Sequence, residues 1–358
     1  MRVKLKDITK FSKGTQINGK NLIDDGAYSY LNGGINPSGK WNEFNVAENT
    51  VTISEGGNSS GYVNYMSKAF WCGAHCYYLY DGPKNSKYLY YALKSQQERL
   101  FRIRSGACMP NIKKSDLGNF IIEYEEDETR QEEVVKVLEK CELLIEDYNK
   151  KLALLDEAVR ARFVEMFGDV FLNPMEWPEK KLESLADIVS GITKGRKTTE
   201  TDLQEVPYMA VSNVKDGYID WTTVKTILAT RREIEQYRLM PDDILMTEGG
   251  DPDKVGRGAI IKMPLKNSIH QNHIFRVRLN EQEILPDFLA EYLQHQKAKR
   301  YFLGCAKQTT GIASINMRQL KALPTLVPPL SLQNQFAAFV ERVDQQKQTV
   351  QQSLEKLE

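Results

Sequence analysis

Two stretches of the chain carry apolar residues at alternating spacings of four and three. The first, within residues 129–168, has these positions at Val134, Leu138, Cys141, Ile145, Tyr148, Leu152, Leu155 and Val159. The second has them at Phe336, Val340, Val343, Val350, Leu354 and Leu357, with Lys347 as a polar interruption. This is the heptad spacing of helices that pair along an apolar seam. It predicts two long helices, over 126–169 and 327–358. Their expected pairing residues are Leu138, Ile145, Leu152, Leu155, Val340, Val343, Val350 and Leu354.

The segments before these helices, residues 1–125 and 170–326, have a different pattern. Short β-rich runs such as YVNYMSKAFWCGAHCYYLY (62–80) and HIFRVRLN (273–280) are separated by Gly, Asn and Pro turns. Amphipathic helical patterns follow at 87–103 and 286–304. We therefore expect an α+β protein in which each of two mixed α/β domains is followed by a long helix.

The second half of the chain repeats the order of motifs in the first. An offset of 202 superposes the two heptad series, TISEGG (52–57) matches LMTEGG (245–250), and MPNIKKSDL (109–117) matches SINMRQL (314–320). The regions between these motifs differ in length and sequence, which indicates a duplicated frame with two different inserts in a pseudo-twofold arrangement. The second series stops at Leu357, so the counterpart of 157–168 is missing. The chain either ends early or has been cut short.

Charge is unevenly distributed although the whole chain is neutral, with 48 basic and 48 acidic residues. Residues 1–120 carry 16 basic against 9 acidic residues, residues 121–180 carry 8 against 17, and residues 181–325 carry 21 against 18. Basic globular parts permit binding to a polyanion. No secretory signal or membrane-spanning stretch is visible, and the five cysteines follow no disulfide framework. We expect a cytoplasmic protein without membrane association.

The repeated TISEGG and LMTEGG motifs could belong to a phosphate-binding or catalytic loop. Neither has the spacing of a phosphate loop or a dinucleotide fingerprint, so a glycine turn after a buried strand is the simpler interpretation. Residues 239–254 lack the spacing of nuclease carboxylates, and no methyltransferase motif is present. Cys72, His75 and Cys76 have no second ligand pair for a zinc site. We expect no catalytic residue, metal or cofactor in this chain.

Loops of both domains instead hold the residue types that contact nucleic acid. Lys, Arg and hydroxyl side chains bind phosphates, whereas Asn, Gln and Arg side chains also bind base edges. Any one of these loops could be an ordinary solvated turn, but their occurrence in two basic domains joined to paired helices favours DNA binding. The candidate contacts are Lys13, Thr15, Gln16, Asn32, Lys40, Asn58, Ser59, Lys113, Lys194, Arg196, Lys197, Asn213, Lys254 and Arg257.

Over essentially its whole length the chain resembles the specificity subunits of type I restriction–modification systems. The resemblance rests on the duplicated frame and on KLKDI and KLESLADI at the start of the two halves. It also rests on MPNIKKSDL and SINMRQL at their ends, and on LDEAVRARFVEMFGD and LPTLVPPLSLQNQ at the two helices. The acidic IIEYEEDETRQEE (121–133) departs from the proline-containing run before the second helix.

This resemblance implies a non-catalytic reader of double-stranded DNA. In this family each variable domain is a target recognition domain for one half of a split target, and two antiparallel helices set the gap between the halves. Two methyltransferase subunits that use S-adenosylmethionine dock on the frame, and restriction subunits that use ATP and Mg²⁺ can join them. The alternatives are a coiled-coil scaffold whose globular domains bind proteins, and a degenerate enzyme fused to a coiled coil.

Overall fold

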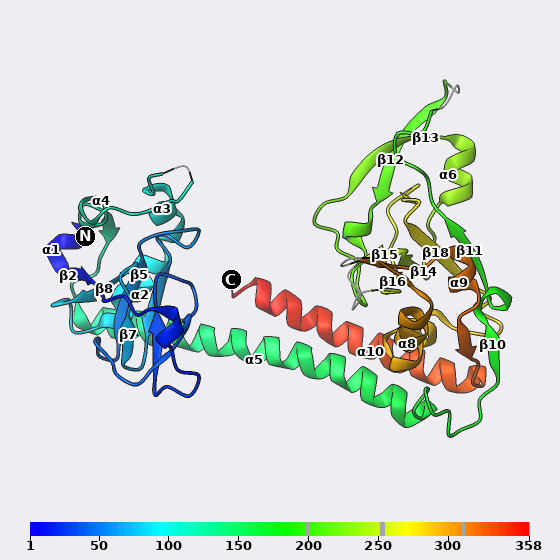
Figure 1. Cartoon of the computed structure of the whole chain (residues 1–358), viewed down its shortest axis with the longest axis horizontal. Helices are drawn as coiled ribbons and strands as arrows, with labels where there is room; N and C mark the ends of the chain where they lie inside the picture. Colours follow the sequence, from blue (N-terminus) through cyan, green and yellow to red (C-terminus); the bar gives the residue numbers. More distant parts are fainter. Residues whose placement is uncertain (107, 198–200, 251–254, 310–311, 358) are drawn as a thin grey trace. The chain divides into compact units, whose positions relative to one another are not determined.

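The computed structural model describes residues 1–106, 108–197, 201–250, 255–309 and 312–357. The chain forms two compact units, Met1–Glu146 and Asp147–Glu358 (Figure 1). Each unit combines small sheets with short helices, and the 40-residue helix α5 (Glu128–Phe167) begins in the first unit and ends in the second. The α+β class predicted from the sequence is confirmed. No helix within the described ranges is both long enough and apolar enough to cross a lipid bilayer.

The first unit is built on a four-stranded antiparallel sheet. Its strand order is β2 (Lys10–Lys13), β8 (Cys76–Tyr80), β5 (Thr50–Ser54) and β6 (Val63–Met66). The remaining strands are β4 (Gly39–Trp41), β3 (Tyr28–Leu31) and β7 (Phe70–Cys72) in one sheet, and β1 (Arg2–Lys4) with β9 (Ile121–Glu123) in another. The helices are α1 (Leu5–Ile8), α2 (Ser86–Lys94), α3 (Gln97–Arg102), α4 (Lys114–Gly118) and the 3₁₀ turn η1 (Gly19–Asn21). Leu89 and Leu93 of α2 share a hydrophobic cluster with Val51 and Ile53 of β5, which joins the helix to the sheet.

The second unit is built on a similar four-stranded sheet. Its order is β11 (Ala186–Ser190), β18 (Ile274–Leu279), β14 (Asp243–Thr247) and β16 (Gly258–Ile261). The smaller sheets are β13 (Lys225–Thr230), β12 (Leu203–Met209) and β17 (Ile269–His270); β15 (Gly249–Gly250), β20 (Ile312–Ser314) and β19 (Lys307–Thr309); and the pair β10 (Glu179–Lys181) and β21 (Pro324–Leu326). The helices are α6 (Arg231–Tyr237), α7 (Pro286–Gln294), α8 (Gln296–Cys305), α9 (Met317–Lys321), α10 (Leu330–Glu355) and the 3₁₀ turns η2 (Leu182–Ser184) and η3 (Val211–Asn213).

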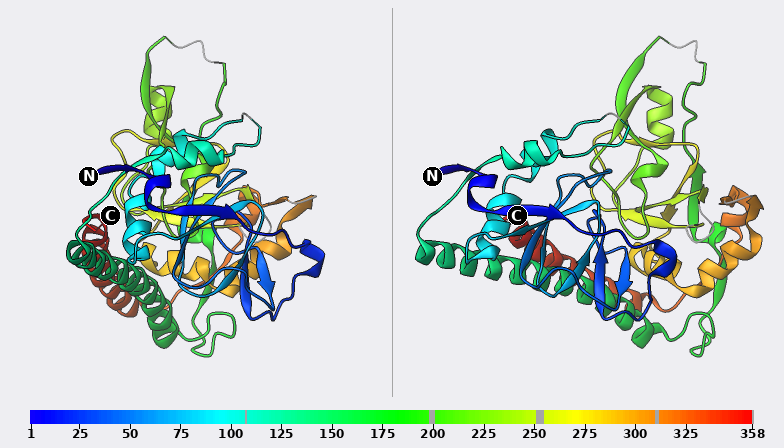
Figure 2. Two further views of the ribbon diagram at one scale, coloured as in Figure 1. Left: turned by 90° about the vertical axis from the view of Figure 1, so that its left-hand side faces the viewer. Right: turned by 60° about the vertical axis from the view of Figure 1, so that its left-hand side comes forward.

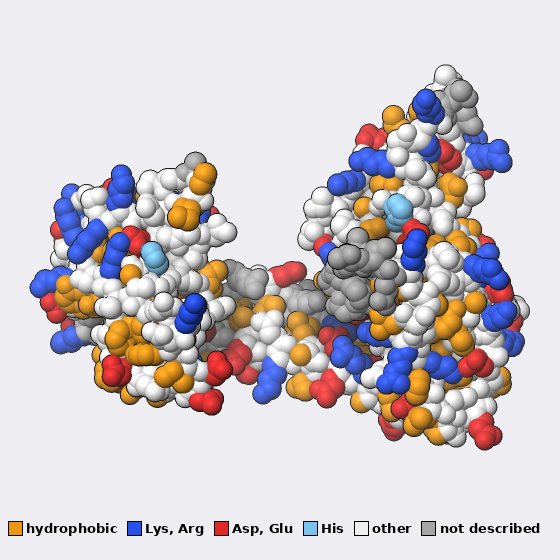
Figure 3. Space-filling model, in the orientation of Figure 1, with side chains coloured by type: hydrophobic (Ala, Val, Ile, Leu, Met, Phe, Trp, Pro, Cys, Tyr) orange, Lys and Arg blue, Asp and Glu red, His pale blue; other side chains and the backbone are white. Residues whose placement is uncertain are grey.

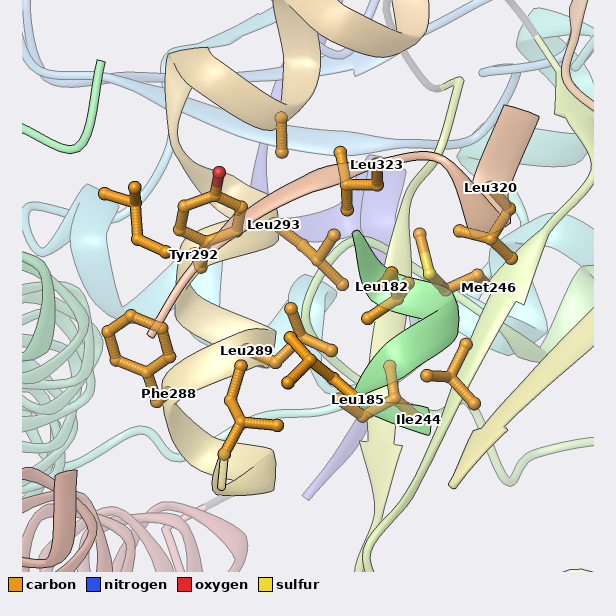
Figure 4. Close-up of a cluster of buried hydrophobic side chains, with 14 of the residues drawn as sticks. Leu182, Leu185, Ile244, Met246, Phe288, Leu289, Tyr292, Leu293, Leu320 and Leu323 are labelled. Atoms are coloured by element: carbon orange, nitrogen blue, oxygen red, sulfur yellow. The ribbon is translucent and has the colours of Figure 1, made fainter. Parts of the chain in front are cut away.

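The main core of the second unit lies between α7 and the four-stranded sheet (Figure 4). Phe288, Leu289 and Leu293 of α7 are buried together with Ile244 and Met246 of β14. Burial of side chains of this size contributes about 1.5–3 kcal/mol each relative to an exposed position. This core fixes the position of β14, whose end carries the LMTEGG motif.

The two units share one strand topology. The sheet β2-β8-β5-β6 corresponds to β11-β18-β14-β16, and the two-stranded pair β1-β9 corresponds to β10-β21. The sheet β4-β3-β7 corresponds to β13-β12-β17, and in both of these sheets one neighbouring pair is parallel and the other antiparallel. The prediction of two similar mixed α/β domains from a duplicated frame is confirmed.

Helix α10 lies beside the C-terminal part of α5 (Figure 2). Phe336, near the start of α10, contacts Phe163 and Phe167 with ring centroids 5.4 and 5.7 Å apart. Further along α10, the Nζ atom of Lys347 lies 2.6 Å from Oδ1 of Asp156. The contacts move backwards along α5 as they advance along α10, so the helices are antiparallel. Lys347 interrupts the apolar series because it forms an ion pair with the opposite helix.

The predicted pairing residues differ in burial. Leu155, Val340 and Val343 belong to the main hydrophobic cluster of the second unit, and Val350 is 4% exposed. The half-buried members are Leu138, Ile145, Leu152 and Leu354. Pairing of the complete set therefore stays a prediction.

The first position of the predicted seam is wrong. Val134 is 41% exposed, whereas its neighbour Val135 is 9% exposed. In this part of α5 the helix faces α2, because the hydroxyl of Tyr91 donates to Glu142 at 2.7 Å and Lys87 lies 3.7 Å from the same carboxylate. Packing on a globular domain, and not on a second helix, therefore selects the buried face here.

Candidate nucleic-acid interface

The end of β5 is a junction of three segments of the first unit. The backbone N–H of Glu55 donates to the carbonyl of His75 at 2.9 Å, and the N–H of Ile112 donates to the carbonyl of Glu55 at 2.9 Å. The strand end thus holds the turn between β7 and β8 and the segment before α4. Strands β2 and β5 both end at this edge of the sheet, while β8 begins there. We name it the Glu55 edge.

The same junction occurs in the second unit. The N–H of Glu248 donates to the carbonyl of His273 at 3.0 Å, and the N–H of Ile315 donates to the carbonyl of Glu248 at 2.8 Å. Strands β11 and β14 end at this edge, which we name the Glu248 edge. TISEGG and LMTEGG therefore mark one structural position in two copies of a domain.

The first glycines of the two motifs are equivalent, because Gly56 bridges Asn111 as Gly249 pairs with Ser314, but the second glycines differ. Gly57 has φ of 75° and forms the expected turn, in which its N–H donates to the carbonyl of Pro110 at 2.9 Å. Gly249 and Gly250 instead form the short strand β15, paired with Ser314 and Ala313. The glycine-turn interpretation is confirmed for the first copy and wrong for the second, because the pairing with β20 keeps the second copy extended.

A close backbone approach is also repeated beside each edge. A Cβ atom on Gly14 would overlap the carbonyl oxygen of Cys72, and one on Gly191 would overlap that of His270. The residue after each glycine is hydrogen-bonded to the same carbonyl. The N–H of Thr15 donates to Cys72, and the N–H of Ile192 donates to His270, each at 2.9 Å. These bonds hold the loops that contain the predicted contacts Thr15 and Lys194.

Several predicted contacts come together at the Glu55 edge. Lys13 is exposed and forms an ion pair with Glu55. Oδ1 of Asn32 accepts from the N–H of His75 at 3.2 Å, and Oγ of Ser59 donates to the carbonyl of Gly33 at 2.5 Å. Asn58 is exposed on the loop after the glycines, and Lys113 directly follows Ile112 of the junction. Asn32 and Ser59 are therefore partly occupied in holding the loops.

Three further predicted residues of the first unit are exposed. Thr15 and Gln16 lie in the loop that follows Lys13, the last residue of β2. Lys40 lies on β4, in the smaller three-stranded sheet and not in the sheet that ends at the Glu55 edge. Figure 3 shows Lys and Arg side chains and exposed histidine side chains on both units.

The predicted contacts of the second unit are more dispersed. Lys194 and Lys197 are exposed in the loop after β11. Arg196 is held within the unit, because its guanidinium pairs with Glu233 and donates to the carbonyl of Leu228 at 3.1 Å. Hydrogen bonding to Arg196 lowers the pKa of Glu233, so that carboxylate stays charged. Arg196 is thus committed to an internal ion pair.

Asn213 is buried, at 3% exposure. Its side-chain amide donates to the carbonyls of Asp220 and Thr223 at 2.9 and 3.0 Å, and its Oδ1 accepts from the N–H of Ala210 at 2.9 Å. These bonds close the loop that it belongs to. Arg257 is half-buried and its carbonyl accepts from the N–H of Thr247, while Lys254 lies outside the described residues.

A histidine beside each junction is absent from the predicted contacts. Nδ1 of His75 lies 3.6 Å from Oε2 of Glu55, and Nδ1 of His273 lies 2.6 Å from Oε2 of Glu248. The signal was present in the sequence, because GAHC (73–76) and QNHI (271–274) both place a histidine just before a central strand. The pairing itself joins residues 20 or 25 positions apart and needs the fold to become visible.

The cysteines near His75 are part of the core. Cys72 and Cys76 are buried, and a hydrogen bond with Cys76 together with burial raises the pKa of the Cys72 thiol. A raised pKa disfavours the thiolate that a metal would require. Among the described residues, no group of three or more His, Cys, Asp or Glu side chains is arranged to hold a metal ion.

A family model described as the type I restriction modification DNA specificity domain matches residues 1–156 and, a second time, residues 174–358. The chain belongs to this family. Its two matches correspond to the two halves of the duplicated frame. The resemblance noted from the sequence motifs is thereby confirmed.

Curated relatives of the type I specificity family include specificity subunits from three bacteria. A subunit from Mycoplasma pneumoniae is 37% identical over 149 residues, or 41% of this chain and 40% of that protein. One from Mycoplasma genitalium is 35% identical over 192 residues, or 51% of this chain and 48% of the relative. The EcoKI specificity subunit of Escherichia coli is 24% identical, over 64% of this chain and 47% of its own length. The chain thus spans about half or less of the length of these relatives.

Solved structures support the fold. The type I restriction–modification S subunit of Mycoplasma genitalium aligns with a TM-score of 0.61 at 22% identity, covering 100% of this chain and 92% of that one. A chain from a structure titled for complex assembly and conformational transition of the type I system aligns with a TM-score of 0.54 at 14% identity, covering 100% and 94%. These alignments show that the chain shares the fold of both structures.

Proposed function

We propose that this chain is the sequence-specific DNA-binding subunit of a type I restriction–modification complex, with one half of a bipartite double-stranded target bound by each unit. The observation that carries the proposal is the duplicated junction at Glu55 and Glu248, in a chain that the specificity-domain family matches twice. Two copies of one frame with unlike loops provide two readers of unlike half-sites. The target recognition domains would be residues 1–125 and 170–326.

The proposed binding surface consists of the exposed residues at the two edges. Lys13, Thr15, Gln16, Asn58 and Lys113 belong to the first unit, and Lys194 and Lys197 to the second. Cations at such positions bind phosphates and the amides can read base edges. Arg196 and Asn213 are left out of this surface because both are occupied within their own loops.

The proposed role is non-catalytic. The paired helices, over 126–169 and 327–358, would set the gap between the half-sites and dock two methyltransferase subunits. Those subunits would use S-adenosylmethionine, and restriction subunits would use ATP and Mg²⁺ within the same cytoplasmic complex. Support comes from the names of the relatives and from the antiparallel contact between α5 and α10.

Binding to duplex DNA over a salt series, by the chain with its methyltransferase subunit, tests the proposal. Matched lysines sharpen the test. Lys13 and Lys194 lie at the edges, whereas Lys68 and Lys266 follow β6 and β16 at the opposite ends of the same sheets. Replacing Lys13 or Lys194 by Ala should weaken binding and reduce the log–log salt slope by about 1, the value for one lost phosphate contact.

The control variants Lys68→Ala and Lys266→Ala should bind as the wild type does. Equal losses from all four variants would contradict the assignment of the edges. Absence of any salt-sensitive affinity for duplex DNA would refute the function and favour a scaffold whose globular domains bind proteins.

A further inference from the structure

Each junction carries a glutamate and a histidine whose side chains face one another. The glutamates are partly buried, with 15% of the Glu55 side chain and 35% of the Glu248 side chain exposed. The histidine side chains are largely exposed, at 62% for His75 and 57% for His273. Each pair therefore presents an imidazole to solvent over a carboxylate that the fold holds in place.

The fold itself does not need these side chains. The bonds that join the three segments of each junction use only backbone N–H and carbonyl groups, such as those between Glu248, His273 and Ile315. An exposed ion pair adds about 0–1 kcal/mol to stability. The recurrence of both side chains at one position of two copies therefore requires an explanation other than folding.

Neighbouring positions have diverged between the copies. The residue whose carbonyl approaches the glycine is Cys72 at the end of β7 in the first unit and His270 at the end of β17 in the second. Lys13, which joins the first pair, ends β2, whereas the corresponding strand β11 ends at Ser190. The Glu–His pair is thus a shared feature within a variable surrounding.

The geometry of the second pair defines which atom is available. Nδ1 of His273 lies at hydrogen-bond distance from the carboxylate of Glu248, which orients the ring. Nε2 makes one long contact, 3.4 Å from the amide Nδ2 of Asn272. Because Nδ2 is itself a donor, an acceptor of the DNA would displace it when Nε2–H donates. Beside the pair is a cavity of about 360 Å³ lined by Val211, Glu248, Gly249, His273 and Ser314. The carboxylate, imidazole and hydroxyl of this lining are groups that hydrogen-bond to nucleic acid.

We propose that the pairs Glu55–His75 and Glu248–His273 are equivalent DNA contacts, one for each half of the target. In each, the imidazolium, the ring form that carries a proton on both nitrogens, donates through Nε2–H to an acceptor of the DNA, either a phosphate oxygen or a purine N7. Each glutamate is a positioning residue. Oε2 of Glu248 lies 2.6 Å from Nδ1 of His273 and accepts from Nδ1–H, whereas Oε2 of Glu55 lies 3.6 Å from Nδ1 of His75 and orients the ring by its charge. This inference rests on the proposed function, and it adds residues that lie beside the cations Lys13 and Lys194 at the same edges.

The test uses the complete chain with its methyltransferase subunit and measures affinity for the specific duplex, for duplexes mismatched in one half, and over a salt series. His75→Ala and His273→Ala should each lower specific affinity by about 5- to 100-fold, the range of one good contact. Glu55→Gln and Glu248→Gln should give smaller losses, because the imidazole stays but loses its fixed orientation. Each variant should affect discrimination in only one half of the target.

Two measurements, the salt dependence of binding and the effect of His→Gln, distinguish a phosphate oxygen from a purine N7 as the acceptor on the DNA. For a phosphate oxygen, His→Gln should resemble His→Ala and the salt slope should fall by about 1. For a purine N7, the salt slope should stay unchanged, His→Gln should recover part of the affinity, and discrimination should relax at one base pair. The unchanged backbone junction predicts wild-type circular dichroism and thermal unfolding for the Gln variants, which makes loss of folding detectable.

Affinity and discrimination within two-fold of wild type for both His→Ala variants would overturn the inference while leaving the proposed function standing. A wild-type complex that shows no salt-sensitive DNA affinity would instead overturn the proposed function, and the inference with it. Lys68→Ala and Lys266→Ala, at the opposite ends of the sheets, serve as controls for non-specific loss of charge.

Discussion

The close approach at Gly14 and Gly191 allows a paired test of the duplicated frame. A Cβ atom added to Gly14 would lie 1.8 Å from the carbonyl oxygen of Cys72, and one added to Gly191 would lie 1.9 Å from that of His270. Both distances are far shorter than the 3.0 Å below which Cβ contacts are essentially never found. The obstacle is backbone, so no side-chain rotation can relieve it. Gly14→Ala and Gly191→Ala should therefore have similar effects although the residues around them differ.

The size of the effect follows from two terms. Overpacking of this kind costs about 1–3 kcal/mol. Displacing the loop also breaks the bond from Thr15 to Cys72 in the first unit or from Ile192 to His270 in the second, and a hydrogen bond contributes about 1 kcal/mol. We expect each variant to lose about 2–4 kcal/mol of unfolding free energy.

Urea denaturation followed by circular dichroism measures the loss, and hydrogen exchange assigns it to one unit. Gly19→Ala and Gly304→Ala are the matched controls, because an added Cβ meets no atom within 4 Å at either position. Gly304 lies in α8, so its replacement should stabilise by up to about 1 kcal/mol. Losses below about 0.5 kcal/mol for both Gly14→Ala and Gly191→Ala would refute the shared close approach.

Three further predictions concern the second unit. Phe336→Ala should destabilise by about 3–5 kcal/mol in urea denaturation because the ring is fully buried, and a loss no larger than that of partly buried Phe339→Ala would contradict the packing. Lys347→Leu should change stability by less than about 1 kcal/mol, because its pair with Asp156 is partly exposed; a larger loss would show that the ion pair is essential. Burial lowers the pKa of His270 to about 4, so the neutral ring stabilises the folded state fully above about pH 6.5. The free energy of unfolding should fall by about 3 kcal/mol as the pH drops from 6.5 to 4, because the unfolded chain binds the proton first. His270→Gln should remove this component of the pH dependence measured by urea denaturation.

The sequence allowed the architecture to be predicted because its signals are local or repeated. Heptad spacing located α5 and α10, and the recurrence of TISEGG as LMTEGG located one strand end in each copy. The prediction that Val134 is a buried heptad position was wrong, because the sequence pattern does not show that this part of α5 packs on a globular domain. A heptad identifies an apolar face but not the element that covers it.

The candidate site was less predictable because side-chain use depends on loop conformation. Arg196 and Asn213 have suitable chemistry for DNA contact, yet one is paired with Glu233 and the other closes its own loop. The Glu–His pairs were missed because their members are separated in sequence by most of a strand-turn-strand unit. Only the junction formed by the backbone brings Glu248 and His273 together.

The measurement that tests the central claim most directly is a map of adenine methylation in cells that express this chain with the methyltransferase subunit proposed as its partner. The map would be compared with one for a chain in which residues 1–120 come from another family member. The account predicts a bipartite target in which only one half changes, with the gap unchanged. A target that changes in both halves, or methylation that does not depend on this chain, would contradict the model of two independent readers on one frame.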